Sequence, residues 1–128
     1  MIYDFKNKIQ SLIKNGEGIT LEFKECKNKV TKSLYETICA FLNRYGGEIL
    51  LGVTDQGEIT GIDDVESIKK EIISIINNPQ KINPPVYLSI ETVEIENKKI
   101  LYLYVPQSSQ AHSFKICKNL LGTGTAIY

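Results

Sequence analysis

The chain has 128 residues, of which 42% are hydrophobic and 23% are charged, the composition of an ordinary soluble globular protein. Fifteen basic and fifteen acidic residues leave no net charge, which argues against a strongly basic protein that would bind nucleic acid without specificity over its whole surface. The sequence has no apolar run long enough to cross a membrane, and its first residues do not resemble a secretory signal, so we expect a single cytoplasmic domain.

The first elements in chain order are a predicted helix and a predicted strand. Apolar residues recur at helical spacing over residues 4–13, and the helix is expected to end near Gly16. Polar and apolar residues alternate over residues 20–24, which predicts a strand with Glu22 and Lys24 on the same face. Two charged side chains on one strand face need water, a partner or a ligand.

A second helix and a buried strand are expected next. Hydroxyl side chains at residues 31–33 can cap the helix, and Gly46-Gly47 ends it. The apolar face of this helix is expected to comprise Leu34, Ile38, Phe41, Leu42 and Tyr45. Residues 49–53 are apolar without alternation, which predicts a central strand covered on both faces. A turn then leads to a predicted antiparallel partner strand at residues 58–62.

The second half of the chain predicts a third helix followed by a hairpin. The helix covers residues 63–77 and is opened by two aspartates near its positive end. After the prolines at 84–85, residues 86–95 and 99–105 read as paired strands, in which Tyr87, Tyr102 and Tyr104 are packing aromatics or, alternatively, stack on bases. The expected fold class is therefore α+β, a single domain with a mixed, mostly antiparallel sheet packed with about three helices.

Three separated groups of residues resemble the Schlafen-type, AlbA-like DNA-binding domain family. They are Gly16-Glu17 with Leu21-Glu22-Phe23-Lys24, then Ile38-Cys39-Ala40-Phe41-Leu42-Asn43 with Gly46-Gly47, then Gly52-Val53-x-Asp55 with Gly57 and Gly61. The resemblance covers residues 10–110, whereas residues 111–128 match poorly and read as a diverged or truncated end. It implies a nucleic-acid-binding domain, with DNA as the expected ligand, in a protein that regulates transcription.

The resemblance also implies a set of site residues. In animal Schlafens a related lobe cleaves tRNA with acids in a Glu-x4-Glu-x-Lys pattern, which Glu17, Glu22 and Lys24 match here, with Asp55 as the third acid. Such carboxylates would bind Mg²⁺ or Mn²⁺, and Lys24 would stabilise the charged transition state. The alternative is structural: Glu22 pairs with Lys24 or a helix lysine, and Asp55 only forms a turn.

Lysines are concentrated ahead of the second helix. Lys24, Lys27, Lys29 and Lys32 are the candidate phosphate contacts, and a solvated face is the alternative reading. The three cysteines lie too far apart in sequence for a disulfide framework or a paired zinc site, so no other cofactor is expected. Three functions follow as hypotheses: a nucleic-acid-binding domain, a metal-dependent endoribonuclease, and a protein-interaction or dimerisation module, for which a homodimer is one possible form.

Overall fold

The computed structural model describes residues 5–109, 111–114 and 126–127. Three helices and seven strands are distributed along these residues. In chain order they are α1 (Phe5–Asn15), β1 (Leu21–Lys24), α2 (Lys32–Asn43), β2 (Gly47–Leu51), α3 (Val65–Ile76), β3 (Ile82–Asn83), β4 (Ser89–Ile95), β5 (Lys98–Val105), β6 (Ser113–Phe114) and β7 (Ala126–Ile127).

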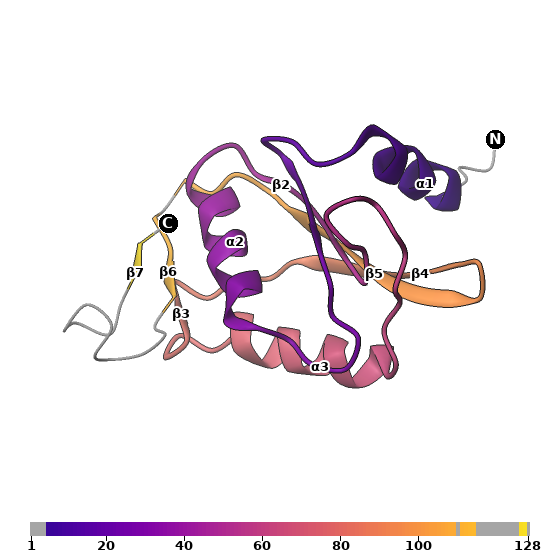
Figure 1. Ribbon diagram of the computed structural model, residues 1–128. Coiled ribbons are helices and arrows are strands. Elements are labelled where there is room, and N and C mark those ends of the chain that lie inside the picture. Colours follow the sequence, from indigo (N-terminus) through magenta and orange to yellow (C-terminus); the bar gives the residue numbers. More distant parts are fainter. Residues whose placement is uncertain (1–4, 110, 115–125, 128) are drawn as a thin grey trace.

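The main sheet has four strands in the order β1-β2-β5-β4. β1 runs parallel to β2, whereas β2 pairs antiparallel with β5 and β5 pairs antiparallel with β4. The short strands β3, β6 and β7 form a second sheet. α2 and α3 lie on one side of the main sheet and α1 lies on the other, as Figure 1 shows. The predicted α+β class with a mixed, mostly antiparallel sheet is confirmed.

β2 is the strand around which both layers pack. Ile49 and Leu51 face α2 and α3, and Leu50 faces α1. All three side chains are fully buried, so the prediction of a strand covered on both faces is confirmed. An apolar run without alternation has this consequence because each face of the strand must be removed from water.

α1 is attached to the sheet by an apolar residue and a polar network. Ile9 is fully buried against the sheet. The ammonium group of Lys8 donates to the hydroxyl of Tyr102 at 3.1 Å, and that hydroxyl donates to the carboxylate of Glu48. The ring of Phe5 packs edge-on against Tyr102 at 5.1 Å. Burial and the bond to Glu48 raise the pKa of Tyr102 to about 12, which keeps its hydroxyl a donor.

The predicted strand at residues 58–62 is wrong. An isolated antiparallel bridge joins Val53 to Ile59, and the amides of Thr60 and Gly61 both donate to the carbonyl of Gly52. Both glycines have positive φ, 98° at Gly52 and 81° at Gly61, so the chain curls back after β2 and does not continue as a ladder.

Two expectations about α2 also need correction. Tyr45 lies beyond the end of the helix and is 72% exposed, because α2 ends at Asn43 before the turn into β2. Thr31 occupies the N-cap position, but its side chain makes no cap hydrogen bond and its hydroxyl contacts that of Ser33 at 2.9 Å. By contrast, Asp64 caps α3 as expected, accepting from the amide of Ser67 at 3.2 Å.

His112 connects the segment after β5 to the rest of the fold. Its side chain is buried, with Nδ1 at 2.8 Å from the carbonyl oxygen of Pro84 and Nε2 at 2.8 Å from the hydroxyl of Ser108. Its main-chain amide and carbonyl both bond the side chain of Asn43 in α2. His112 therefore connects α2 to the loop that contains Pro84 through hydrogen bonds.

The turn from α2 into β2 allows a stability test of one glycine. Gly46 has φ of +75°, and an added Cβ would lie 2.7 Å from the carbonyl oxygen of Val105. We expect Gly46→Ala to lower the free energy of unfolding by about 2 kcal/mol or more, because it combines left-handed strain with a main-chain clash. Urea unfolding measures the change.

Gly16→Ala is the matched control. Gly16 has φ of +86° with nothing within 4 Å of an added Cβ, so it tests strain without a clash. We expect a loss of roughly 1 kcal/mol. Equal losses in the two variants would show that the contact with Val105 relaxes without cost.

Candidate functional site

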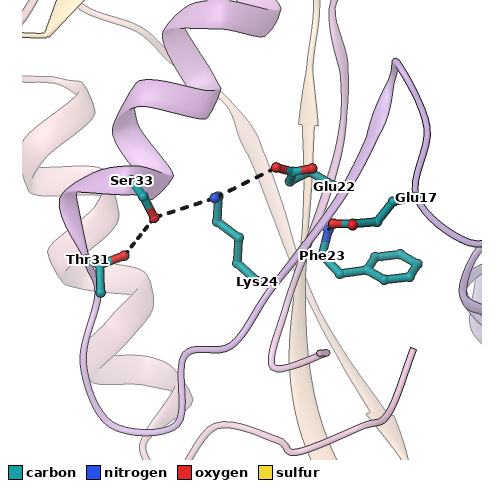
Figure 2. A network of polar contacts seen from close by, with 6 residues as sticks. All are labelled: Glu17, Glu22, Phe23, Lys24, Thr31 and Ser33. Atoms are coloured by element: carbon teal, nitrogen blue, oxygen red, sulfur yellow. Dashed lines mark hydrogen bonds and ion pairs between the residues drawn. The ribbon is translucent and has the colours of Figure 1, made fainter. Parts of the chain in front are cut away.

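Glu22 and Lys24 lie side by side on the edge strand of the main sheet. In the register they stand opposite Ile49 and Leu51, so both point to the side that α2 and α3 cover. The ammonium nitrogen of Lys24 is 3.9 Å from a carboxylate oxygen of Glu22 and 3.5 Å from the hydroxyl of Ser33 near the start of α2. Figure 2 shows Lys24 extended between these two partners. The prediction of one shared strand face is confirmed.

Glu17 lies at the outer edge of the same strand. Its carboxylate accepts the main-chain amide of Phe23 at 2.8 Å, as Figure 2 shows. Among the strands that the structure describes, β1 pairs with β2 alone, and the amide of Phe23 points to the open side, where it would otherwise need water. The carboxylate of Glu17 therefore supplies the hydrogen-bond acceptor that a neighbouring strand would otherwise provide.

Asp55 approaches from the turn that follows β2. The amides of Gly52 and Val53 donate to the carbonyl of Lys24, at 2.7 and 3.3 Å, so the end of β2 stays beside the end of β1. The amide of Gly57 donates to the carbonyl of Thr54 at 2.9 Å, which makes Asp55 part of a tight turn. Asp55 is thus a turn residue in a segment that begins beside the end of β1.

The pKa of Glu22 shows how closely the charges are grouped. It is raised above its usual 4.5, first by partial burial and then by repulsion from Glu17. Hydrogen bonding with Glu17 and the negative charge of Asp55 raise it further, whereas Lys24 lowers it. Glu17, Asp55 and Lys24 are therefore each close enough to Glu22 to influence its charge. The ion pair that the structural alternative expected is also present.

The acids do not form a closed ligand set for a metal ion. Within residues 5–109, 111–114 and 126–127, no three Asp, Glu, His or Cys side chains lie close enough together to hold one. Glu17 is turned toward the main chain of β1, and Lys24 lies beside Glu22. A cation at this edge would have to replace the contact with Lys24 or draw Glu17 away from Phe23.

The lysines named from the sequence have different surroundings. The side chain of Lys24 is only 17% exposed and belongs to the network with Glu22. Lys27, Lys29 and Lys32 are exposed, and Lys27 approaches Asp63 at 3.6 Å. We call Lys24, Lys27, Lys29 and Lys32 the sequence patch. One of its lysines, Lys24, points inward, and the other three lie on the surface.

Sequence reasoning missed two lysines next to Lys27. Lys98 and Lys99 begin β5 and line a pocket together with Lys27 and Asp63. The sequence places Lys98 in the turn of the predicted hairpin and Lys99 at the start of its second strand. Only the path of residues 60–63 between the two segments brings these lysines beside Lys27. Of the tyrosines considered for base stacking, Tyr102 is buried, whereas Tyr87 and Tyr104 are 78% and 51% exposed.

Comparison with known proteins establishes the family. The family model described as Schlafen, AlbA_2 matches residues 17–126, so the chain belongs to this family and the expected resemblance is confirmed. The match continues beyond the limit expected at residue 110. Most of residues 111–128, which we expected to have diverged, lie outside the described residues.

Solved structures show the same fold. The N-terminal domain of a RecG-related protein from Nitrosomonas europaea, whose name likens it to an ATP-dependent DNA helicase, is similar with a TM-score of 0.63 and 23% identity, over 83% of this chain and 74% of that one. The DIP2311 protein of Corynebacterium diphtheriae gives a TM-score of 0.59 and 16% identity, over 84% of this chain and 27% of that one. A comparison with curated proteins found no match.

Among the described residues, no helix is both long and apolar enough to cross a membrane.

The charge grouping at β1 predicts how the pKa of Glu22 responds to its neighbours. Glu17→Gln should lower that pKa because it removes the repelling carboxylate, and Lys24→Met should raise it because it removes the compensating cation. An NMR titration of the Glu22 side chain measures both changes. The same apparent pKa in the wild type and in both variants would contradict this account.

The same shift predicts a pH dependence of stability. The folded-state pKa of Glu22 lies above 4.5, so folding favours its protonated form. The contribution of Glu22 is therefore present in full below pH 4.5 and is lost as pH rises through the raised pKa. Glu22→Gln should flatten this part of the stability curve, measured by urea unfolding at a series of pH values.

Proposed function

We propose that this chain is a nucleic-acid-binding domain of a protein that acts in transcription regulation, with DNA as the expected ligand. Membership of the Schlafen, AlbA_2 family over residues 17–126 carries the proposal. The helicase-like name of the Nitrosomonas europaea protein, whose domain shares the fold, supports it.

The charge distribution of the chain supports contact with nucleic acid over a limited part of its surface. The whole chain has no net charge, so electrostatic attraction to phosphates must come from local groups of lysines. Lys24 is engaged with Glu22 and Ser33, so surface lysines and main-chain amides are the groups proposed to contact phosphates. Exposed aromatic rings such as Tyr87 and Tyr104 offer faces on which unpaired bases could stack.

A second candidate function is metal-dependent cleavage of RNA. One observation favours it: Glu22 and Lys24 share a face of β1, Glu17 bonds the main chain of the same strand, and the turn that carries Asp55 begins beside the end of β1. An Mg²⁺ or Mn²⁺ ion would be held by these carboxylates only after Lys24 left Glu22 or Glu17 left the amide of Phe23. It would then supply an activated water and neutralise phosphate charge. Glu22 would then bind the ion, and Lys24 would stabilise the developing negative charge.

One experiment separates these functions. The purified protein is incubated with labelled single-stranded DNA, duplex DNA and tRNA, with Mn²⁺ or EDTA, and resolved on native and denaturing gels. A binding domain gives a shifted band that weakens steeply with salt and leaves the strands intact. Absence of any shift, together with an oligomer in solution, would instead favour the protein-interaction function.

Glu22→Gln is the decisive variant in that assay. If the protein is a nuclease, the variant should lose metal-dependent cleavage while it keeps or gains affinity, because a negative charge near the phosphate has been removed. If the protein only binds, the variant has no cleavage to lose. Cleavage that persists in the variant would exclude a catalytic role for this acid.

A further inference from the structure

A polar pocket lies between Lys27, which follows β1, residues 60–63, and residues 97–99 at the start of β5. Its volume is about 340 Å³, and the charged side chains around it are Lys27, Lys98, Lys99 and Asp63. Three lysines and one aspartate therefore line this pocket, so its basic residues outnumber its acidic ones. Such an excess of positive charge in a concave surface attracts anions.

Two adjacent main-chain amides hold this pocket together. The amide of Ile62 donates to the carbonyl of Lys99 at 2.8 Å, and the amide of Asp63 donates to the carbonyl of Lys27 at 2.7 Å. Two lysines that are far apart in the sequence are thus fixed on either side of one short segment. A ligand would find their main chain already in place, so little ordering is needed when it binds.

Gly61 lets the third lysine approach the same segment. Its φ is +81°, and an added Cβ would lie 3.1 Å from the Cβ of Lys98. The ammonium group of Lys98 donates to the carbonyl of Ile59 at 3.2 Å. The stem of Lys98 therefore passes close over Gly61, and its charged end is bonded at Ile59, from which an anion in the pocket would have to draw it.

The acids near the pocket do not cancel its charge. Asp63 approaches Lys27 at 3.6 Å, but the two side chains are 56% and 65% exposed. Exposed pairs of this kind contribute little and can be exchanged for another anion. Glu94 stands opposite Lys99 in the register of β4 and β5, so it compensates one of the three lysines in part.

We propose that this pocket binds a phosphate group. Ammonium groups donate strong, charge-assisted hydrogen bonds to phosphate oxygens, and a pocket of about 340 Å³ suits one phosphate with part of an attached sugar. Where the phosphate belongs to a nucleic-acid backbone, the proposal rests on the proposed function. It then places the phosphate contacts on Lys27, Lys98 and Lys99, and not on Lys24, Lys29 and Lys32, the other three lysines named from the sequence.

The test compares two double variants with equal loss of charge. Lys98→Gln with Lys99→Gln removes two lysines of the pocket, and Lys70→Gln with Lys81→Gln removes two exposed lysines elsewhere. Each protein is titrated with inorganic phosphate and, separately, with a single-stranded oligonucleotide, while amide resonances are followed by NMR. Resonances of residues outside the pocket that overlay with those of the wild type confirm that each variant is folded.

We expect inorganic phosphate to shift the amides of Gly61, Ile62 and Asp63 in a saturable manner in the wild type and the control, but not in the pocket variant. Oligonucleotide affinity should fall only in the pocket variant, and the slope of log affinity against log salt should decrease by about 0.7 for each lost phosphate contact. Lys99→Gln alone, which leaves Lys98 packed on Gly61, should give an intermediate result.

The outcomes separate this inference from the proposed function. Saturable binding of inorganic phosphate in a protein that does not bind the oligonucleotide would support the pocket as a site for a free phosphoanion, while the nucleic-acid function fails. Oligonucleotide binding that weakens equally in the pocket and control variants, with no phosphate-dependent shifts at residues 61–63, would overturn the pocket and leave the nucleic-acid function standing. Loss of binding in a Lys29→Gln, Lys32→Gln variant alone would overturn it in favour of the sequence patch.

Discussion

The burial of β2 on both faces is the constraint on which the rest of the structure depends. A strand with Ile49, Leu50 and Leu51 fully buried needs a layer on each side of the sheet, and α1 provides one while α2 and α3 provide the other. Such a strand cannot expose its side chains to a ligand, so functional groups must lie where it ends or on its neighbours. The acids on β1 and the turn after β2 occupy those places.

Gly52, at the end of that strand, joins the two charged regions. Its amide bonds the carbonyl of Lys24 in β1, and its carbonyl accepts the amides of Thr60 and Gly61, which lead into the lysine pocket. The mainly acidic group at β1 and the mainly basic pocket are therefore both connected to this glycine. A net charge of zero over the whole chain conceals this local separation of opposite charges. Composition alone gives a poor picture of what the surface attracts.

The sequence predicts most of the main sheet and the three helices because their signals are local. Alternation places Glu22 and Lys24 on one face, and an unbroken apolar run identifies the buried strand. The signal fails at residues 58–62, where alternating residues suggest a strand but two positive-φ glycines turn the chain back onto Gly52. In this segment the turn geometry, and not the local strand propensity, determines the structure.

The candidate site was predictable in part. The family pattern identified Glu17, Glu22 and Asp55, but no local pattern indicates that the carboxylate of Glu17 accepts an amide of the edge strand. Lys98 and Lys99 could not be assigned to a site, because their proximity to Lys27 comes from hydrogen bonds made by Ile62 and Asp63. Contacts between residues far apart in sequence depend on the whole fold, which a single sequence does not display.

The position of α1 has a consequence for where this folding unit begins. The family match starts at residue 17, after α1 has ended, yet Ile9 of that helix is fully buried against the sheet. Leu21, Phe23 and Leu50 belong to the same apolar cluster as Ile9. A fragment cut at the family boundary would present these side chains to water and would tend to associate with other molecules. The start of the family match and the start of the folding unit are therefore different in this protein.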